Sequence, residues 1–327
     1  MRVFVAGASG ALGRRLVPQL IDAGHEVVGT HRSRGTTELL RRLGAKPVRL
    51  DLLDAQAVRQ AVLAHEPEAI IHEATALGNA KWGRSFDKVF APTNALRTRG
   101  TDALLAAGRE AGVRRFVAQS FASYRYVRDG GPVKTEDDPL DERPPANARQ
   151  SFAAMVYLDR TVTEAGGIIL RYGGFYGAEN DGLIEAVRTR RFPIIGSGDG
   201  MTSMIHLDDA ASATVLALDG EESAIYNIVD DDPAPVREWL PVMAKALGAK
   251  PPRHIPAWLA RPLAGEAAVI MGTEARGASN AKAKRELGWT LRYPSWREGF
   301  PAVYSALAAR QGRRPQEAPH RPPHPAS

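Results

Sequence analysis

Short apolar runs alternate with longer stretches of helical periodicity through the first half of the chain. A continuous apolar run of about four to eight residues is typical of a buried strand, whereas apolar residues every three to four positions indicate a helix with one buried face. The expected strands cover residues 2–6, 26–30, 47–50, 69–72 and 115–119, and the expected helices cover 12–23, 38–43, 55–64 and 94–111. Strands that alternate with helices in this way predict a parallel sheet covered on both faces.

The second half of the chain is less regular. Residues 121–150 are rich in Asp, Pro, Gly and Arg and lack periodicity, which predicts a long loop over the carboxyl edge of the sheet. The remaining expected elements are helices at 152–164, 236–247 and 281–287 and strands at 167–171 and 226–229. Frequent prolines between the later elements indicate a second, smaller domain.

This order of elements predicts an α/β protein with a Rossmann-type doubly wound parallel sheet and a smaller C-terminal α/β substrate domain. We expect the part built on the doubly wound sheet to cover residues 1–171, with segments from about 204–229 returning to its sheet. Residues 172–203 and 230–312 form the substrate domain. The proline-rich residues 313–327 have little apolar surface to bury, so we expect a disordered tail there.

Composition narrows the class of protein. With 327 residues, 44% hydrophobic and 24% charged, the chain can bury a large core, and disorder as its main state is excluded. The absence of cysteine excludes disulfides, thiolate nucleophiles and cysteine-ligated metals. No run approaches the roughly 18 apolar residues of a membrane span, and the apolar start is too short for a signal peptide. We expect a cytoplasmic protein that does not bind membranes.

The basic charge is scattered along the chain. The formal net charge is +6, but the arginines occur in short clusters beside apolar helical or strand sequence and form no continuous stripe. Clusters of this kind are typical of solvated surfaces, so we expect no nucleic-acid partner. The expected partner is a small-molecule substrate, and the expected assembly is a monomer or a homodimer.

A glycine-rich loop joins the first expected strand to the first expected helix. Glycines at this place permit a tight turn and close approach of a pyrophosphate, whose charge the amide groups of the helix N-terminus attract. A glycine-rich turn without a ligand is the alternative, but the strand–turn–helix context favours dinucleotide binding. The residues expected to bind are Gly7, Ser9, Gly10, Ala11, Leu12 and Gly13.

The end of the second strand bears on the choice of cofactor. The acidic residue that would bind a ribose 2′-hydroxyl is missing there, and Arg32 stands in its place with His31 before it. A guanidinium suits a 2′-phosphate, so we expect NADP, with NAD as the alternative and a solvated Arg32 as the plain reading. We expect His31 to be an exposed loop residue.

Several motifs, taken in order, resemble the extended short-chain dehydrogenase/reductase family, and specifically its NAD-dependent epimerase/dehydratase-like branch. Their order and spacing carry the resemblance, which reaches to about residue 300. The matching segments are the three glycines, Asp51-Leu52-Leu53-Asp54, Ile70-Ile71-His72-Glu73-Ala74, the strand at 115–120, Leu170-Arg171-Tyr172 with Tyr176-Gly177, Ile205-His206-Leu207-Asp208-Asp209-Ala210 and Tyr226-Asn227-Ile228-Val229.

The resemblance implies further cofactor contacts. Asp51 and Leu52 would touch the adenine ring, Ala74 would line the floor beneath the nicotinamide half, and Tyr172 would lie near the nicotinamide carboxamide. A helix-capping role for Asp51 and core roles for Ala74 and Tyr172 are the plain alternatives.

The catalytic residues of the family do not carry over. The family uses a Tyr-x-x-x-Lys pair on the helix after the long loop and a Ser or Thr after the fifth strand, and the Lys lowers the pKa of the Tyr. Alignment on Glu164 places Val156 and Arg160 at the two positions of the pair, whereas alignment on Tyr157 places Thr161 at the Lys position. The usual hydroxyl position holds Phe121.

The candidate catalytic residues are therefore Tyr157 and Ser120, the residue immediately before Phe121. A rotated helix could bring Tyr157 to the nicotinamide, but packing of the helix on the sheet is the simpler reading. Other sources remain open, namely the fixed charge of Arg160 and proton transfer by Tyr124, Tyr126, His72 or Glu73.

Two polar segments in the second half need no metal. His206 with Asp208 and Asp209 resembles a strand-to-helix junction in which an aspartate caps the helix and the histidine fills a polar gap. We expect the run Asp230-Asp231-Asp232-Pro233 to be a solvated turn after a strand.

These features leave three functions open. The first is an NAD(P)-dependent oxidoreductase that acts on the carbonyl or alcohol of a small polar substrate. The second is an epimerase or dehydratase with a tightly held cofactor, and the third is an NADP(H)-binding sensor without catalysis, suggested by the missing Tyr-x-x-x-Lys pair.

Overall fold

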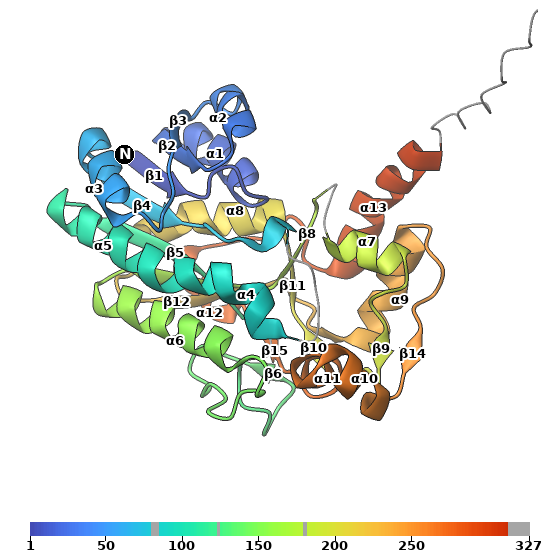
Figure 1. Ribbon diagram of the computed structural model, residues 1–327. Helices are drawn as coiled ribbons and strands as arrows, with labels where there is room; N and C mark the ends of the chain where they lie inside the picture. The colour runs from blue at the N-terminus through green and yellow to red at the C-terminus, as the bar shows by residue number, and fades with distance from the viewer. Residues whose placement is uncertain (80–84, 123–124, 179–181, 313–327) are drawn as a thin grey trace, which may run out of the picture.

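The chain forms a seven-stranded parallel sheet flanked by helices (Figure 1). The computed structural model describes residues 1–79, 85–122, 125–178 and 182–312. Along the sheet the strands are β12 (Ile225–Ile228), β7 (Ile168–Tyr172), β5 (Arg115–Phe121), β4 (Ala69–His72), β1 (Arg2–Ala6), β2 (Glu26–His31) and β3 (Lys46–Arg49). The strand order changes direction between β1 and β4, which is where a doubly wound sheet binds its ligand.

Two helical layers cover the sheet and bury its two faces. Val3 and Val5 of β1 point into one core and Phe4 into the other, because successive strand residues alternate between faces. The first face is covered by α1 (Gly13–Asp22), α2 (Thr37–Arg42), α8 (Leu207–Leu216) and α12 (Ala281–Leu287). The second is covered by α3 (Ala55–His65), α5 (Thr101–Glu110) and α6 (Arg149–Glu164).

Helix α4 (Phe86–Ala95) runs into α5 through a π-helical segment at Leu96–Gly100. The π segment shifts the backbone bonding by one residue, so the amide of Thr101 donates to the carbonyl of Leu96. That carbonyl lies 3.2 Å from Nε2 of His72 at the end of β4. The irregular part of the long helix is therefore attached to the sheet edge.

Helix α6 begins without a cap from its own sequence, because the N-cap residue is Ala148. Asp87 of α4 supplies the cap instead. Its Oδ1 accepts from the amide of Ser151 at 2.8 Å and its Oδ2 from the amide of Gln150 at 3.1 Å. A carboxylate at a helix N-terminus satisfies free amides and complements the helix dipole.

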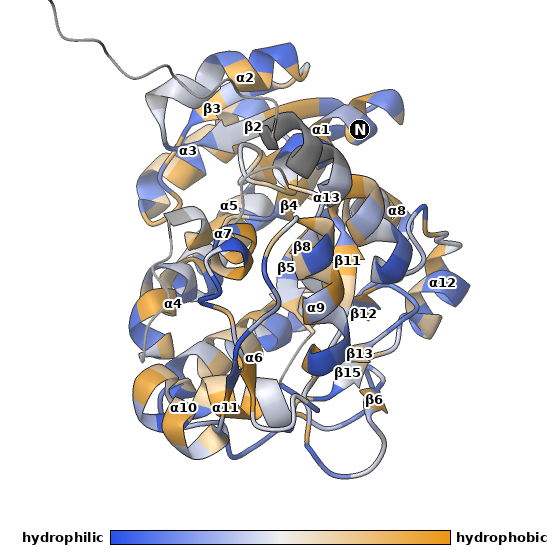
Figure 2. Ribbon diagram, turned by 90° about the vertical axis from the view of Figure 1, so that its right-hand side faces the viewer, coloured by the Kyte–Doolittle hydropathy of each residue, from blue (hydrophilic) through white to orange (hydrophobic). Residues whose placement is uncertain are grey.

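The C-terminal part packs around Trp239, Trp296 and Phe300, which are nearly fully buried. Its helices are α7 (Gly182–Arg188), α9 (Val236–Ala246), α10 (Ala257–Ala264), α11 (Glu266–Thr273) and α13 (Trp296–Gly312). Its short strand pairs are β8 (Gly174–Tyr176) with β11 (Met204–His206), β9 (Ile194–Ile195) with β14 (His254–Ile255), β10 (Met201–Thr202) with β13 (Ala234–Pro235), and β6 (Val133–Lys134) with β15 (Gly277–Ala278). Figure 2 shows the largely apolar α10 and α11, and α11 joins α4 and α6 in a common apolar cluster.

The predicted fold class is confirmed, and the predicted strands of the sheet form within a few residues of their expected positions. The helix expected from residue 94 begins at Phe86, because Pro92 is accommodated inside α4. The loop expected over 121–150 contains the short strand β6. The division into two domains stays a prediction, and the expected tail at 313–327 lies outside the described residues.

Candidate active site

The glycine loop is tightly packed at its two ends. A Cβ added at Gly7 would lie 2.7 Å from the amide nitrogen of Ala74, and one at Gly13 would lie 2.5 Å from the carbonyl oxygens of Gly7 and Ala8. Gly7 also has a φ of 95°, in the left-handed region that side chains disfavour. The amide of Gly7 donates to Oγ1 of Thr30, at 3.1 Å, so β2 also holds the loop in place.

The middle of the loop is open. Gly10 is exposed, and a Cβ there would meet only the carbonyl oxygen of Gly7, at 3.1 Å. Helix α1 begins after it without a side-chain cap, which leaves backbone amides of the first turn for an anion. Ser9 and Ala11 border this space, whereas the side chain of Leu12 is buried in the core and could contribute only its backbone. The loop therefore has the shape and polarity that a pyrophosphate needs.

Arg32 and Arg49 lie at the ends of the neighbouring strands β2 and β3. Both are exposed, and Nε of Arg49 donates to the carbonyl oxygen of Arg32 at 3.3 Å. Sequence reasoning missed Arg49, because its approach to Arg32 depends on the pairing of β2 with β3. The prediction for His31 is wrong, since this side chain is buried and its ring contacts the carbonyl of Ser33 and the hydroxyl of Thr37.

Asp51 and Leu52 follow β3 at the same edge of the sheet. Asp51 is exposed, and its Oδ1 accepts from the amide of Leu53 at 3.0 Å. Leu52 is buried in the second-face core. Asp54, rather than Asp51, caps α3 by accepting from the amide of Ala57. Exposure leaves the second carboxylate oxygen of Asp51 free to meet a ligand.

A buried polar cluster lies directly beneath the glycine loop. Glu73, which follows β4, has an Oε1 that lies 3.1 Å from the hydroxyl of Tyr172, and that hydroxyl lies 2.6 Å from Oγ1 of Thr214 on α8. The amide nitrogen of Gln119, in the orientation that satisfies both of its amide atoms, donates to Oε2 of Glu73 at 3.1 Å. Burial raises the pKa of Glu73 to about 8, against a smaller opposing effect of the Tyr172 hydrogen bond.

The placement of Tyr172 and His72 bears on two sequence predictions. Tyr172 is fully buried and its hydroxyl is directed into the Glu73 cluster, so any contact with a nicotinamide would come from another part of the ring or the backbone. His72 points to the opposite face of the sheet, toward Leu96, and burial lowers its pKa to about 4. A neutral, enclosed imidazole of this kind is a poor candidate for proton transfer to a substrate.

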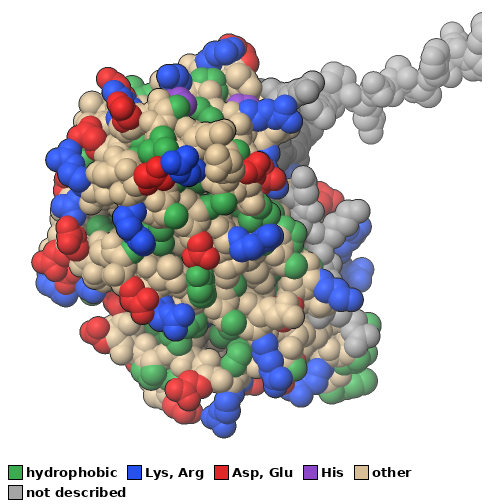
Figure 3. Space-filling model, turned by 60° about the vertical axis from the view of Figure 1, so that its left-hand side comes forward, with side chains coloured by type: hydrophobic (Ala, Val, Ile, Leu, Met, Phe, Trp, Pro, Cys, Tyr) green, Lys and Arg blue, Asp and Glu red, His purple; other side chains and the backbone are tan. Residues whose placement is uncertain are grey.

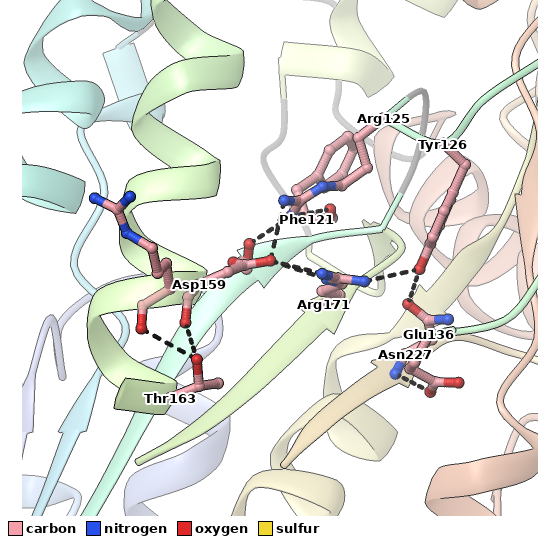
Figure 4. Close-up of polar contacts among 10 residues, drawn as sticks. Phe121, Arg125, Tyr126, Glu136, Asp159, Thr163, Arg171 and Asn227 are labelled. Atoms are coloured by element: carbon pink, nitrogen blue, oxygen red, sulfur yellow. Dashed lines mark hydrogen bonds and ion pairs between the residues drawn. The ribbon is translucent and has the colours of Figure 1, made fainter. Parts of the chain in front are cut away.

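Ser120 is buried and belongs to a second polar cluster with Arg125, Asp159 and Arg171, and Figure 4 shows these three charged side chains. The hydroxyl of Ser120 accepts from Nη1 of Arg125 at 2.9 Å. Oδ2 of Asp159 on α6 lies 3.0 Å from Nη2 of Arg125 and 2.9 Å from Nη2 of Arg171. The three charged side chains are each at most 6% exposed. Arg125 and Asp159 were not singled out from the sequence, because a charged residue in a loop and one on a helix are usually solvated.

Tyr126 extends this cluster toward β12. Its hydroxyl accepts from Nη1 of Arg171 at 3.2 Å and donates to Oδ1 of Asn227 at 2.8 Å (Figure 4). The backbone N–H of Asn227 donates to Oε1 of Glu136. Burial raises the pKa of the Tyr126 hydroxyl, so it stays protonated within these contacts.

Tyr157 faces the neighbouring helix. Its hydroxyl donates to Oδ1 of Asp102 on α5 at 2.7 Å, and this bond raises the pKa of the tyrosine. The placement favours a packing role over proton transfer, and substitution of Tyr157 decides between them. Arg160 is exposed and lies 3.9 Å from Glu164, one helical turn away. Tyr124 lies outside the described residues.

The His206 segment is a strand-to-helix junction as predicted, with one change. Histidine caps the helix, since Nδ1 of His206 accepts from the amide of Asp208, while buried Asp209 accepts from the amides of Arg292 and Tyr293. No group of metal-ligating side chains occurs in the described parts of the chain. The prediction of a solvated turn is wrong for Asp230, which is 1% exposed and accepts from the amide of Trp296 at the start of α13.

The comparison with family models matches residues 3–229 to the NAD-dependent epimerase/dehydratase family. The chain belongs to that family. A reductase from Streptomyces sp, "3-diazoavenalumate denitrifying reductase", is 40% identical over 92% of this chain and 99% of its own length. A second relative, "4-hydroxy-2-methyl-3-oxo-4-farnesyl-3,4-dihydroquinoline-1-oxide ketoreductase" from Stigmatella aurantiaca, is 29% identical over 97% of this chain and 100% of its own.

Solved structures show the same fold. The dTDP-glucose 4,6-dehydratase of Streptomyces venezuelae, solved with NAD, has a TM-score of 0.74 at 22% identity and covers 95% of this chain and 98% of its own. The UDP-glucose 4-epimerase of Thermotoga maritima has a TM-score of 0.73 at 22% identity, over 95% of this chain and 99% of its own.

Charges of both signs are mixed on the surface: basic and acidic side chains are interspersed on the face that Figure 3 shows. None of the helices in the described ranges combines the length and apolar character of a membrane span.

Proposed function

We propose that the chain is a nicotinamide-dependent reductase that delivers hydride to an electrophile whose reduction needs no proton from the enzyme. This proposal rests on a contrast between the glycine loop and the side chains at the expected catalytic positions. The glycine loop has room and polarity for a dinucleotide, whereas Ser120 and Tyr157 are both held by internal hydrogen bonds and Phe121 stands at the usual hydroxyl position.

The residues present fit a dinucleotide. The open space at Gly10 and the uncapped start of α1 suit a pyrophosphate, and Ala74 packs against Gly7 on the floor of the same site. A nicotinamide bound there would supply the hydride. In this proposal Gly7, Ser9, Gly10, Ala11, Leu12 and Gly13 hold the phosphates, Asp51 and Leu52 meet the adenine, and Ala74 and Tyr172 border the nicotinamide half.

The preferred cofactor in this proposal is NADP. Arg32 and Arg49 are exposed side by side at the ends of β2 and β3, and two guanidinium groups offer several charge-assisted donors to a 2′-phosphate. An acidic residue that would favour NAD is missing from the tip of β2.

The reaction that fits these features is the reduction of an aromatic diazo compound with release of dinitrogen. The name of the relative at 40% identity describes a denitrifying reductase of a diazo compound. When hydride reaches an aryl diazonium group, the carbon–nitrogen bond breaks, a carbon–hydrogen bond forms and dinitrogen leaves with no proton consumed. A site without an acid–base pair is sufficient for this reaction, whereas reduction of a ketone requires a proton on the product oxygen.

Ketone reduction is the second candidate, because the relative at 29% identity is named as a ketoreductase. That reaction would need a proton donor in the cleft, and Tyr157, Ser120 or solvent would have to provide it. The substrate in this case is a small carbonyl compound or its alcohol.

The test is a direct competition between these substrates. The purified chain is given NADPH deuterated at the hydride-bearing carbon together with an aryl diazonium salt or a simple ketone, and cofactor oxidation, dinitrogen release and deuterium in the product are followed. We expect deuterium to be incorporated at the aromatic carbon faster than in the enzyme-free background. The control variant Gly10→Val should fold but not bind cofactor, so its rate of incorporation should be far lower than that of the wild-type protein.

The other outcomes select the other functions. Ketone reduction without loss of dinitrogen would reject the proposal in favour of a ketoreductase. Product formation with no net change in cofactor, in a panel of sugar nucleotides, would indicate an epimerase or dehydratase. Tight NADPH binding with no turnover of any substrate would indicate a sensor.

A further inference from the structure

The cluster under the glycine loop contains one more hydrogen-bonding contact than its hydroxyl hydrogens can serve. Three oxygen–oxygen contacts run in line, from Oε1 of Glu73 to the hydroxyl of Tyr172, from there to Oγ1 of Thr214, and from Thr214 to the carbonyl of Ala210. Their lengths are 3.1, 2.6 and 2.7 Å. Tyr172 and Thr214 carry one hydroxyl hydrogen each, so the third contact is complete only if Glu73 carries a proton.

The surroundings of Glu73 agree with a neutral carboxyl group. Gln119, Tyr172 and Thr214 face it from β5, β7 and α8, and none of these carries a charge. His72, its neighbour in the chain, points to the opposite face of the sheet. Glu73 forms no ion pair within the described residues and is 6% exposed. A carboxylate in this position would have no cation beside it among the described residues and little exposure to solvent.

The same residue supports the proposed cofactor site. The amide of Glu73 donates to the carbonyl of Ala6 at 2.8 Å, at the start of the glycine loop. The backbone carbon of Glu73 lies 2.8 Å from the position that a Cβ on Gly7 would take. A shift of the Glu73–Ala74 peptide therefore changes the surface on which the loop rests.

We propose that Glu73 is a positioning residue for the dinucleotide site and that the site binds its cofactor with Glu73 protonated. This inference rests on the proposed nicotinamide cofactor but not on the substrate. Loss of the proton removes one bond from the Glu73–Tyr172–Thr214 series and places a negative charge beneath a loop that receives a negatively charged pyrophosphate. Both effects weaken binding, and the proton is therefore linked to the cofactor.

Affinity for NADPH between about pH 7 and about pH 9, measured by its fluorescence, tests this linkage. If only the protonated form binds, the dissociation constant rises by up to about tenfold per pH unit above the ionisation of Glu73. In Glu73→Gln, whose neutral amide can donate to Tyr172 as the protonated acid does, we expect a change of less than about twofold. Asp230→Asn is the matched control. It removes a second buried carboxyl in the C-terminal part and should retain the wild-type pH dependence.

Calorimetry of the wild-type protein alone provides a second measurement that does not depend on folding of the variant. NADPH binding at about pH 9, compared in buffers of different ionisation enthalpy, should take up close to one proton. A flat pH profile, zero proton uptake, or the same pH dependence in a folded Glu73→Gln would each overturn the inference and leave the proposed function intact. Failure of folded wild-type protein to bind NADPH at any pH would overturn the proposed function and this inference with it.

Discussion

The carboxyl edge of the sheet has two halves that are built differently. At the β1–α1–β2 half, glycines and backbone amides form an open surface, and the three glycines of the family resemblance lie between the end of β1 and the first turn of α1. At the β5–α6 half, Ser120, Arg125, Asp159 and Tyr157 are bonded to one another or to a neighbouring helix. We call the first the open half and the second, whose side chains bond to one another, the closed half.

The difference between the two halves shows that a chain can lose catalytic side chains of such a site and keep the fold. Cofactor binding in the proposed function depends on backbone geometry, because a Cβ at Gly7 or Gly13 would collide with the backbone while Gly10 leaves open space. Acid–base catalysis depends on two or three side chains, and those can be replaced while the helix and strand that carry them stay in place. The predictions below test how separate the two halves are.

The largest effect on stability is expected from removing the buried carboxylate of the closed half. Asp159→Asn leaves Arg125 and Arg171 buried together without a compensating carboxylate. We expect the free energy of unfolding to fall by about 3–5 kcal/mol, measured by urea denaturation. The matched control is Glu164→Gln, which removes an exposed partner of Arg160 on the same helix and should cost less than about 1 kcal/mol. Similar losses in the two variants would contradict the closed half as described.

In the open half, Arg32→Ala should affect cofactor choice and leave stability unchanged. Loss of charge-assisted hydrogen bonds to a 2′-phosphate should weaken NADPH binding by about 1.5–3 kcal/mol and leave NADH nearly unaffected. Titration of both cofactors measures the difference. Equal weakening of the two would place Arg32 outside the 2′-phosphate site, and no weakening would shift the role to Arg49.

A smaller effect on stability is expected from a change of pH. Two buried carboxyl groups, those of Glu73 and Asp230, contribute to it. Burial raises the pKa of Glu73 and of Asp230 to about 8 each. Because these acids bind protons more tightly in the folded state, their stabilising contribution is complete below about pH 4 and is lost as the pH rises through about 8.

We therefore expect the melting temperature to fall between about pH 5 and about pH 8, by about 2–4 °C for each kcal/mol lost. Glu73→Gln and Asp230→Asn should each remove part of that slope. A melting temperature that rises over this range in the wild-type protein would be inconsistent with both assignments.

The smallest effect is expected at Tyr157. Its hydroxyl bonds to Asp102 between two helices, so Tyr157→Phe should retain turnover within about twofold of the wild-type rate. A catalytic proton donor would instead lose about 10²–10⁴-fold with cofactor affinity unchanged. A loss of that size would reopen the β5–α6 half as a source of acid–base catalysis.

Sequence alone was enough to predict the sheet and the glycine turn between β1 and α1, because both depend on local patterns. It failed where a partner lies far along the chain. His31 was predicted to be exposed, but the turn that follows it closes over its ring through Ser33 and Thr37. Asp230 was predicted to be solvated, but the helix that it caps begins 66 residues later.

The cluster under the glycine loop shows the same limit. Glu73 could be named from the sequence as a candidate for proton transfer. Its partner Tyr172, however, lies 99 residues away on β7, and Thr214 lies on helix α8. A single strand end also directs His72 and Glu73 to opposite faces, and burial lowers the pKa of the imidazole while it raises the pKa of the carboxyl group. No local pattern contains that information.

The cap that Asp87 provides for α6 has a consequence for folding kinetics. The first amides of α6 are satisfied by a residue 63 and 64 positions earlier in the chain, so the helix cannot complete its first turn until α4 has docked. Closing so long a loop is entropically costly, and contacts of this range slow folding. We expect the first turn of α6 to form late. In amide hydrogen exchange during refolding, the C-terminal turns of α6 should become protected before the amides of Gln150 and Ser151.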